Sequence, residues 1–190
     1  TIKSIAKDQW EACRSSNGSG NPFLSYDFFS LLETSNSIGH NTGWVPFYIA
    51  FKEKNVVVGI IVSFLKSHSQ GEYVFDHSWA DAYERSGGNY YPKLQVAVPF
   101  TPVSGERILV REEYEDRVDE MLSSAKRLVK ESNLSSLHIT FCNSSFLYVA
   151  KKNSLLIREG IQYHWFNRDY KSFEDFLASL THRKRKNITK

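Results

Sequence analysis

The amino-acid sequence predicts a mixed α/β fold in which helices flank a single mixed central sheet. Two stretches rich in valine, isoleucine and aromatic residues, 44–51 and 55–65, are separated by the polar residues 52–55, which is the pattern of a β-hairpin. The segment 112–131 begins with acidic residues, ends with basic ones and has apolar residues at helical spacing, which predicts an amphipathic helix. Apolar strands that alternate with amphipathic helices are typical of α/β proteins.

The remaining elements follow from the same two periodicities. The expected strands are 2–5, 72–75, 94–100, 137–141 and 156–165. The expected helices are 8–14, a segment capped by Ser25 or Asp27, 144–152 and 172–180. We expect 45–51, 56–65 and 137–141 to be core strands, and 56–62 is so continuously apolar that both of its faces should be covered.

The composition excludes several classes of protein. A length of 190 residues with 41% hydrophobic content is enough to bury a sizeable core, and a net charge of +3 gives no strong field for nucleic acid or an anionic membrane. Cys13 and Cys142 are too few for a disulfide framework or a zinc site, and the six histidines form no His-x-x-x-His pair, so we expect no metal. Without an apolar run of about 20 residues or a signal-peptide core, the chain is expected to be cytoplasmic and to bind no membrane.

Several long strings in the sequence resemble a single family. They are LKSHSQGEYVFD at 65–76, WADAYER at 79–85, YYPKLQ at 90–95, VPFTPV at 98–103, QYHW at 162–165 and RKRKNI at 183–188. Together they are similar to the bacterial family of predicted N-acyltransferases, which is related to the FemAB-type enzymes of peptidoglycan bridges. The order of elements, a hairpin followed by helix, strand, helix and strand, also resembles the N-acetyltransferase-like (GNAT) fold.

This resemblance implies a GNAT-like domain over 1–181 and, at 182–190, the start of a basic helical connector to a second half. Because the first residue is threonine and the sequence stops inside a basic run, we expect a fragment whose partner is its own C-terminal half. The implied activity is transfer of an acyl or aminoacyl group to a small-molecule or peptide amine, with acyl-CoA or aminoacyl-tRNA as the donor. The fragment alone is expected to be inactive and to hold no cofactor.

The segment 76–93 concentrates acids, bases and phenols without clear periodicity between expected strands, and such long irregular stretches are usually functional or disordered. Acyl transfer to an amine needs a base for the amine proton and an acid for the leaving group. The candidate catalytic residues are His77, Asp81 or Glu84 as the base and Tyr83, Tyr90 or Tyr91 as the acid. The candidate substrate-binding residues are Asp76, Arg85, Tyr90, Tyr91 and Lys93. Packing or structural ion pairing is the alternative role for each of them.

The stretch 101–113 departs from the pattern of GNAT enzymes that bind acyl-CoA. Those enzymes use a Gln/Arg-x-x-Gly-x-Gly/Ala loop whose backbone N–H groups hold the pyrophosphate. Here the stretch has one glycine, Gly105, and is followed by acidic residues that repel phosphate. We therefore expect this half not to bind CoA in the usual way.

The basic C-terminal run contains Arg183, Lys184, Arg185 and Lys186. One interpretation is a helix that contacts the phosphates of tRNA or of a nucleotide donor, and the other is an interdomain helix whose charges pair with the second half. We expect the second of these two. The alternative function for the chain as a whole is a non-catalytic domain that binds an acceptor peptide or RNA.

Overall fold

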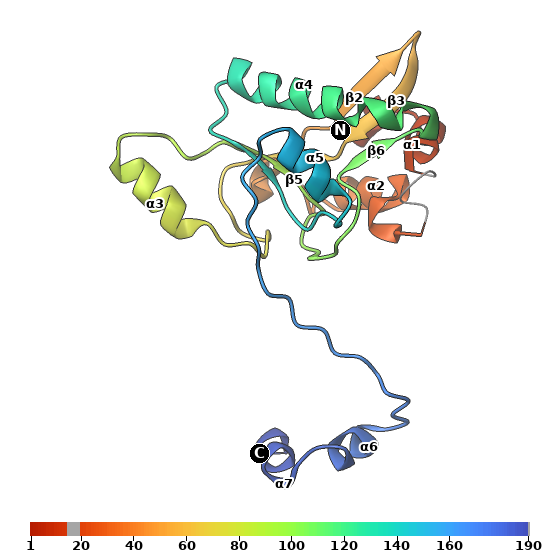
Figure 1. Cartoon of the computed structure of the whole chain (residues 1–190), viewed down its shortest axis with the longest axis vertical. Helices are drawn as coiled ribbons and strands as arrows, with labels where there is room; N and C mark the ends of the chain where they lie inside the picture. Colours follow the sequence, from red (N-terminus) through yellow and green to blue (C-terminus); the bar gives the residue numbers. More distant parts are fainter. Residues whose placement is uncertain (15–19, 190) are drawn as a thin grey trace. The chain divides into compact units, whose positions relative to one another are not determined.

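The computed structural model describes residues 1–14 and 20–189, and its contacts divide the chain into two compact units, Thr1–Ile157 and Arg158–Lys190. The first unit combines helices with mixed sheets, so the predicted mixed α/β class is confirmed (Figure 1). The domain boundary expected at 181 stays a prediction. Within the described residues, no helix has both the length and the apolar character needed to cross a bilayer.

The helices and strands of the first unit alternate along the chain. Its helical elements are η1 Ile2–Ser4, α1 Lys7–Arg14, η2 Pro22–Leu24, α2 Tyr26–Thr34, η3 His40–Thr42, α3 His77–Arg85, η4 Glu112–Arg117, α4 Val118–Glu131 and α5 Phe146–Lys152. Its strands are β1 Trp44–Pro46, β2 Ile49–Glu53, β3 Val56–Ile61, β4 Ser63–Lys66, β5 Lys93–Val96, β6 Ile108–Val110 and β7 Leu137–Ile139.

A long hairpin contributes strands to two sheets, which corrects the expectation of one central sheet. One arm contains β1 and β2, the other contains β3 and β4, and the sheet orders are β1-β4-β5-β7 and β2-β3-β6. Pro46 ends β1 because it has no N–H to donate to a ladder. At the division, Phe47 N donates to Ser63 O at 2.9 Å, so the two arms stay joined there. Predicted core strands 45–51 and 56–65 therefore each extend over both sheets.

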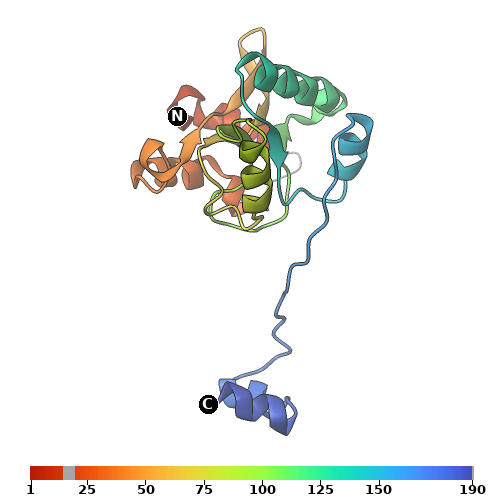
Figure 2. The ribbon, with the colours of Figure 1, turned by 90° about the vertical axis from the view of Figure 1, so that its left-hand side faces the viewer.

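Two connecting segments loop out from the sheets beside β3 and β4, the second arm of the hairpin. β5 pairs antiparallel with β4 and β6 pairs antiparallel with β3, while β5 also pairs in parallel with β7. We call residues 67–92, between β4 and β5, the β4–β5 excursion, and residues 97–107 the β5–β6 excursion. The β4–β5 excursion contains α3, which projects on the left of Figure 1 and faces the viewer in Figure 2.

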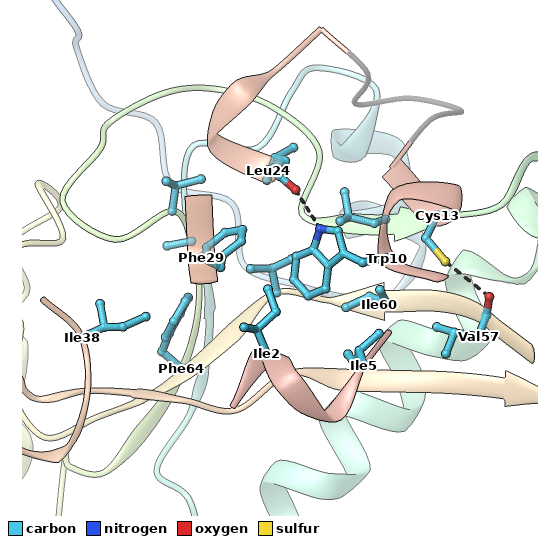
Figure 3. Packing of buried hydrophobic residues seen from close by; sticks show 14 of the residues in the cluster. Ile2, Ile5, Trp10, Cys13, Leu24, Phe29, Ile38, Val57, Ile60 and Phe64 are labelled. Carbon is cyan, nitrogen blue, oxygen red and sulfur yellow. Dashed lines mark hydrogen bonds between the residues drawn. The ribbon is translucent and has the colours of Figure 1, made fainter. Parts of the chain in front are cut away.

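Apolar clusters cover both faces of β3, as the continuous apolar run 56–62 predicted. On one face, Val57 and Ile60 pack against residues of α1 and α2, with Trp10 at the centre (Figure 3). The Trp10 side chain is fully buried, and its indole Nε1 donates to Leu24 O at 2.9 Å. On the other face, Val58 and Ile61 pack against the apolar stripe of α4, the helix predicted most clearly from the sequence.

Four expected elements differ from the structure. Residues 2–4 form the 3-10 helix η1, because the Thr1 side chain accepts from Lys3 N and caps it. The expected strand 72–75 has bends in place of a strand, and 156–165 has no strand. The segment 76–93 is only partly irregular, since 77–85 form α3 and 86–92 have no helix or strand.

The second unit contains α6, Phe173–Ala178, and α7, His182–Ile188. Ser172 caps α6, because its Oγ accepts from Asp175 N at 3.1 Å. The Phe176 ring packs against Trp165 and Tyr170, with ring centroids 6.1 Å and 5.6 Å away. The predicted helix at 172–180 is confirmed, one turn shorter than expected.

Candidate functional site

A buried group of charged side chains lies on the first sheet, where β4 and β5 end beside each other. Lys66 and Lys93 are cross-strand neighbours, and both side chains are fully buried. Lys93 Nζ donates to Glu72 Oε2 at 2.8 Å and to Asp76 Oδ2 at 2.6 Å. Both carboxylates come from the β4–β5 excursion, so this segment supplies the counterions for the sheet.

Asp76 has the most complete set of partners in this group. Its Oδ2 also accepts from Tyr90 OH at 2.7 Å, and its Oδ1 accepts from Ser69 Oγ. Ser69 Oγ lies 2.6 Å from Tyr91 OH. Burial acts to raise the pKa of Asp76, but the hydrogen bonds from Lys93, Ser69 and Tyr90 outweigh it and bring the pKa to about 2. Asp76 is therefore a stable anion at neutral pH.

Lys66 and Glu72 are less completely satisfied. Lys66 Nζ lies 3.8 Å from the centre of the Trp44 ring and donates to Gln70 O at 3.2 Å. Burial lowers the pKa of Lys66 to about 8. Burial also raises the pKa of Glu72, against the hydrogen bond and charge of Lys93. In the part of the chain that the structure describes, Glu72 Oε1 has no hydrogen-bond partner.

Replacing Lys66 by methionine is expected to remove a pH dependence of stability. Because the folded pKa is about 8 and the ordinary value is 10.5, the unfolded state binds more protons between these pH values. The wild-type stability contributed by this group therefore rises from pH 8 to 10.5, by at most on the order of 3 kcal/mol. Urea unfolding of both proteins at several pH values measures the difference, and Glu72, Asp76 and Lys93 are the neighbouring charges that both proteins share. A constant difference across this window would contradict the prediction.

Further polar side chains continue the same face of the first sheet. Gln95 lies two residues after Lys93 on β5, and its register partner on β7 is His138. His138 Nδ1 lies 3.7 Å from Asp76 Oδ2. The Gln95 Nε2 donates to Thr140 Oγ1 at 3.1 Å, whereas its buried Oε1 has no hydrogen-bond partner among the described residues. The first sheet thus presents a polar, buried face to the β4–β5 excursion.

The structure separates the predicted site residues into two groups. The first group is buried or half-buried around Lys93 and consists of Asp76, Tyr90, Tyr91 and Lys93. The second group is exposed on α3 and consists of His77, Asp81, Tyr83, Glu84 and Arg85. The rings of Tyr83 and Tyr90, whose centroids are 6.1 Å apart, connect the groups. The predicted residues are therefore neighbours, but they do not all line one enclosed cleft.

Two shallow, open hollows lie on the surface of α3. One, of about 440 Å³, is lined mainly by Trp79 and Tyr83 with small neighbours. The other, of about 370 Å³, is lined by Asp81, Glu84 and Arg85. Arg85 Nε donates to the backbone carbonyl of Asp81 at 3.1 Å, so its position relative to the two carboxylates is partly fixed. This surface presents two carboxylates, a guanidinium and one phenol to solvent.

Sequence reasoning missed four members of the buried group: Lys66, Ser69, Glu72 and Gln95. Lys66 is the last residue of β4 and Lys93 is the first residue of β5. A lysine at the end of a strand is usually exposed. Part of the signal is present in the sequence, because each of the two strands carries a lysine. The two lysines indicate a buried charged group only if the strands are known to be neighbours.

The β5–β6 excursion is held by a buried arginine. Arg107 donates to Thr140 O at 2.7 Å, to Val103 O at 2.5 Å and to Glu106 O at 2.9 Å. Burial lowers its pKa to about 10. The guanidinium is thus engaged with backbone carbonyls, and acidic residues open η4 after β6.

Two further observations concern metals and the basic run. Within 1–14 and 20–189, no group of three or more His, Cys, Asp or Glu side chains is placed to hold a metal ion. The four basic residues Arg183, Lys184, Arg185 and Lys186 are exposed on α7. Arg185 Nη2 donates to Leu180 O at 3.2 Å, which ties it to the turn before the helix.

The fold and this site define an α/β protein with a charged, buried sheet face and an exposed helix, α3, in the segment that covers it. A family model described as FemAB-like, peptidoglycan biosynthesis/recognition, matches residues 1–190. The chain belongs to the FemAB-like family, and the chemistry of that family is peptidoglycan-related acyl or aminoacyl transfer with peptide or tRNA-linked substrates. Comparisons with curated proteins and with solved structures gave no match.

Proposed function

We propose that the chain is the front half of an N-acyltransferase and that its first unit binds the amine acceptor, a peptide of peptidoglycan or its precursor. The observation that carries this proposal is the position of α3. Its exposed carboxylates, phenol and guanidinium follow directly on a buried ionic group that joins Glu72 and Asp76 of the excursion to Lys93 of β5.

The acceptor amine enters as an ammonium and must lose a proton before it attacks. The carboxylates of Asp81 and Glu84 attract the ammonium at the second hollow, and either one can accept its proton. The neutral nitrogen then forms the new bond to the acyl carbon of the donor, while the bond from that carbon to the sulfur or oxygen of the donor breaks. Tyr83, at the edge of the neighbouring hollow, supplies a proton to the leaving group, and its phenolate then takes the second proton that the nitrogen loses as the amide forms. Arg85 holds an anionic group of the acceptor.

The donor is acyl-CoA or aminoacyl-tRNA, and the second half of the protein supplies its binding site. Two observations support a donor site outside this unit: Arg107 is engaged with backbone carbonyls, and η4 begins with acidic residues. The first 190 residues alone are therefore inactive.

Three substitutions on α3 test the acceptor site in the intact protein: Tyr83→Phe, Glu84→Gln and Arg85→Ala. Each is expected to weaken binding of a soluble muropeptide with a free amino group, or to lower its acylation, at least tenfold. The melting temperature should stay within a few degrees, because these side chains are exposed and act on the bound complex. Calorimetry measures the binding of the muropeptide, and thermal unfolding measures the melting temperature.

Glu131→Gln and Arg127→Ala are matched controls, because both residues are exposed on α4, away from α3. They should change neither binding nor melting temperature. If the three α3 variants unfold the unit without a separate loss of binding, α3 has a structural role and the proposal is wrong.

The exposed basic face of α7 favours a second candidate, a non-catalytic domain that binds RNA. Filter binding of tRNA at graded salt distinguishes the two functions, since several phosphate contacts give a steep dependence of affinity on salt. Tight tRNA binding together with no effect of the α3 substitutions supports the second candidate.

A further inference from the structure

The β4–β5 excursion is attached to the first sheet by polar contacts. Among the described residues, neither apolar cluster of the first unit includes a member of 67–92. The two lysines make several of these contacts, those of Lys66 with Gln70 O and of Lys93 with Glu72, Asp76 and Ser69. Trp44 Nε1 also donates to Gln70 O at 3.1 Å, and Ser135 donates to the carbonyls of Tyr90 and Pro92. Two lysines on paired strands therefore hold the acidic residues of the excursion.

The two lysines form a rigid, positively charged floor. They are register partners on adjacent strands, and β4 and β5 both have neighbours on their other sides. Their ammonium groups point to the same face of the sheet, because antiparallel partners share a face. Such a pair of cations needs anions nearby, and in this structure carboxylates of the excursion supply them.

Asp76 and Glu72 differ in how firmly they are held. Asp76 accepts hydrogen bonds at both oxygens, from Lys93, Tyr90 and Ser69. Glu72 is bound through Oε2 alone, while the buried Oε1 has no partner among the described residues. A buried carboxylate oxygen without a hydrogen bond costs free energy that is recovered when the group moves into water. Glu72 is therefore the counterion that an external anion can replace.

We propose that Lys66 and Lys93 form a binding site for an oxyanion, a phosphate or carboxylate group of a ligand, and that the Glu72 carboxylate occupies this site in the present conformation. Exchange needs only the turn 71–75 to move. Gly71 has φ of +77°, a conformation open to glycine, and the flanking side chains of Tyr73 and Phe75 are more than half exposed. Asp76 and α3 stay in place, because the bonds of Asp76 remain.

The exchange replaces one anionic partner at the site by another. One anion leaves Lys93 as another arrives, so the desolvated lysines keep the same number of negative partners. This inference does not rest on the acceptor role of α3, since its readout is the binding of a simple anion and involves no transfer reaction.

Calorimetric titration with inorganic pyrophosphate and, separately, with succinate tests the proposal. Glu72→Gln removes the internal anion with little change of shape, and it should bind one of the two probes at least tenfold more tightly than the wild type. The double variant Lys66→Met, Glu72→Gln should lose that gain. Preference for pyrophosphate assigns a phosphate-bearing ligand, and preference for succinate assigns a carboxylate-bearing one.

The control is Glu131→Gln, which should behave as the wild type. Equal binding by the wild type, Glu72→Gln and the double variant would overturn the proposal, as would no binding by a folded Glu72→Gln protein. If Glu72→Gln does not fold, hydrogen exchange of the wild type decides: pyrophosphate or succinate should accelerate exchange in 71–75, and unchanged exchange with both probes rejects the site.

Discussion

Replacing Lys93 by methionine is expected to lower the free energy of unfolding by about 3–5 kcal/mol, because it leaves two buried carboxylates without their shared counterion. The loss should be large even though methionine fills a similar volume. Urea unfolding at neutral pH, followed by circular dichroism, measures it.

The double variant Lys93→Met, Asp76→Asn separates the ionic contribution from packing. Asparagine removes one of the two uncompensated charges, so the double variant should be more stable than Lys93→Met alone. If the two substitutions are simply additive, Lys93 contributes through its volume, and the ionic account of the excursion is wrong.

Trp10→Ala is the second substitution with a large expected effect, about 3–5 kcal/mol. The indole is fully buried, packs against Phe29 and Tyr48 with centroids 5.5 Å and 5.4 Å away, and holds η2 through Leu24 O (Figure 3). Its removal leaves a cavity at the centre of the cluster and an unsatisfied carbonyl. Chemical denaturation gives the value.

Tyr148→Ala is the matched control, because Tyr148 is an aromatic residue on α5 with 74% of its surface exposed. Its replacement should cost less than about 0.5 kcal/mol. A loss at Trp10 as small as that at Tyr148 would show that the cluster around the indole can collapse and refill the space.

The elements that bury a regular stripe were predictable from the sequence. The apolar positions of α4 and the continuous run in β3 follow from helical and strand periodicity, which are local properties. α3 was missed because it has no buried stripe: Ala80 is its one buried residue among nine. Its larger apolar side chains, Trp79 and Tyr83, are exposed, so they do not mark a face that packs on the core.

The division of the sheet and the buried ionic group were not predictable, because both depend on which strands become neighbours. Like charges directly opposite each other are unfavourable in a sheet, so sequence reasoning does not pair Lys66 with Lys93. The pairing of the two lysines is stable because the carboxylates of Glu72 and Asp76, on the excursion, lie close enough to neutralise their charge. The sequence reasoning selected the segment 76–93, which includes Asp76 and Lys93 of the buried group, but it did not include Lys66 or Glu72.

The two ends of the β4–β5 excursion are cross-strand neighbours, so the sheet closes this loop whatever its length. Doubling the length of a flexible loop costs only about 0.6 kcal/mol of chain entropy. Evolution can therefore lengthen, shorten or exchange the residues between Lys66 and Lys93 without shifting the register of the strands. Any other segment at this position must still bring acidic groups to the ammonium groups of Lys66 and Lys93. The outer surface of such a segment is free to diverge in sequence.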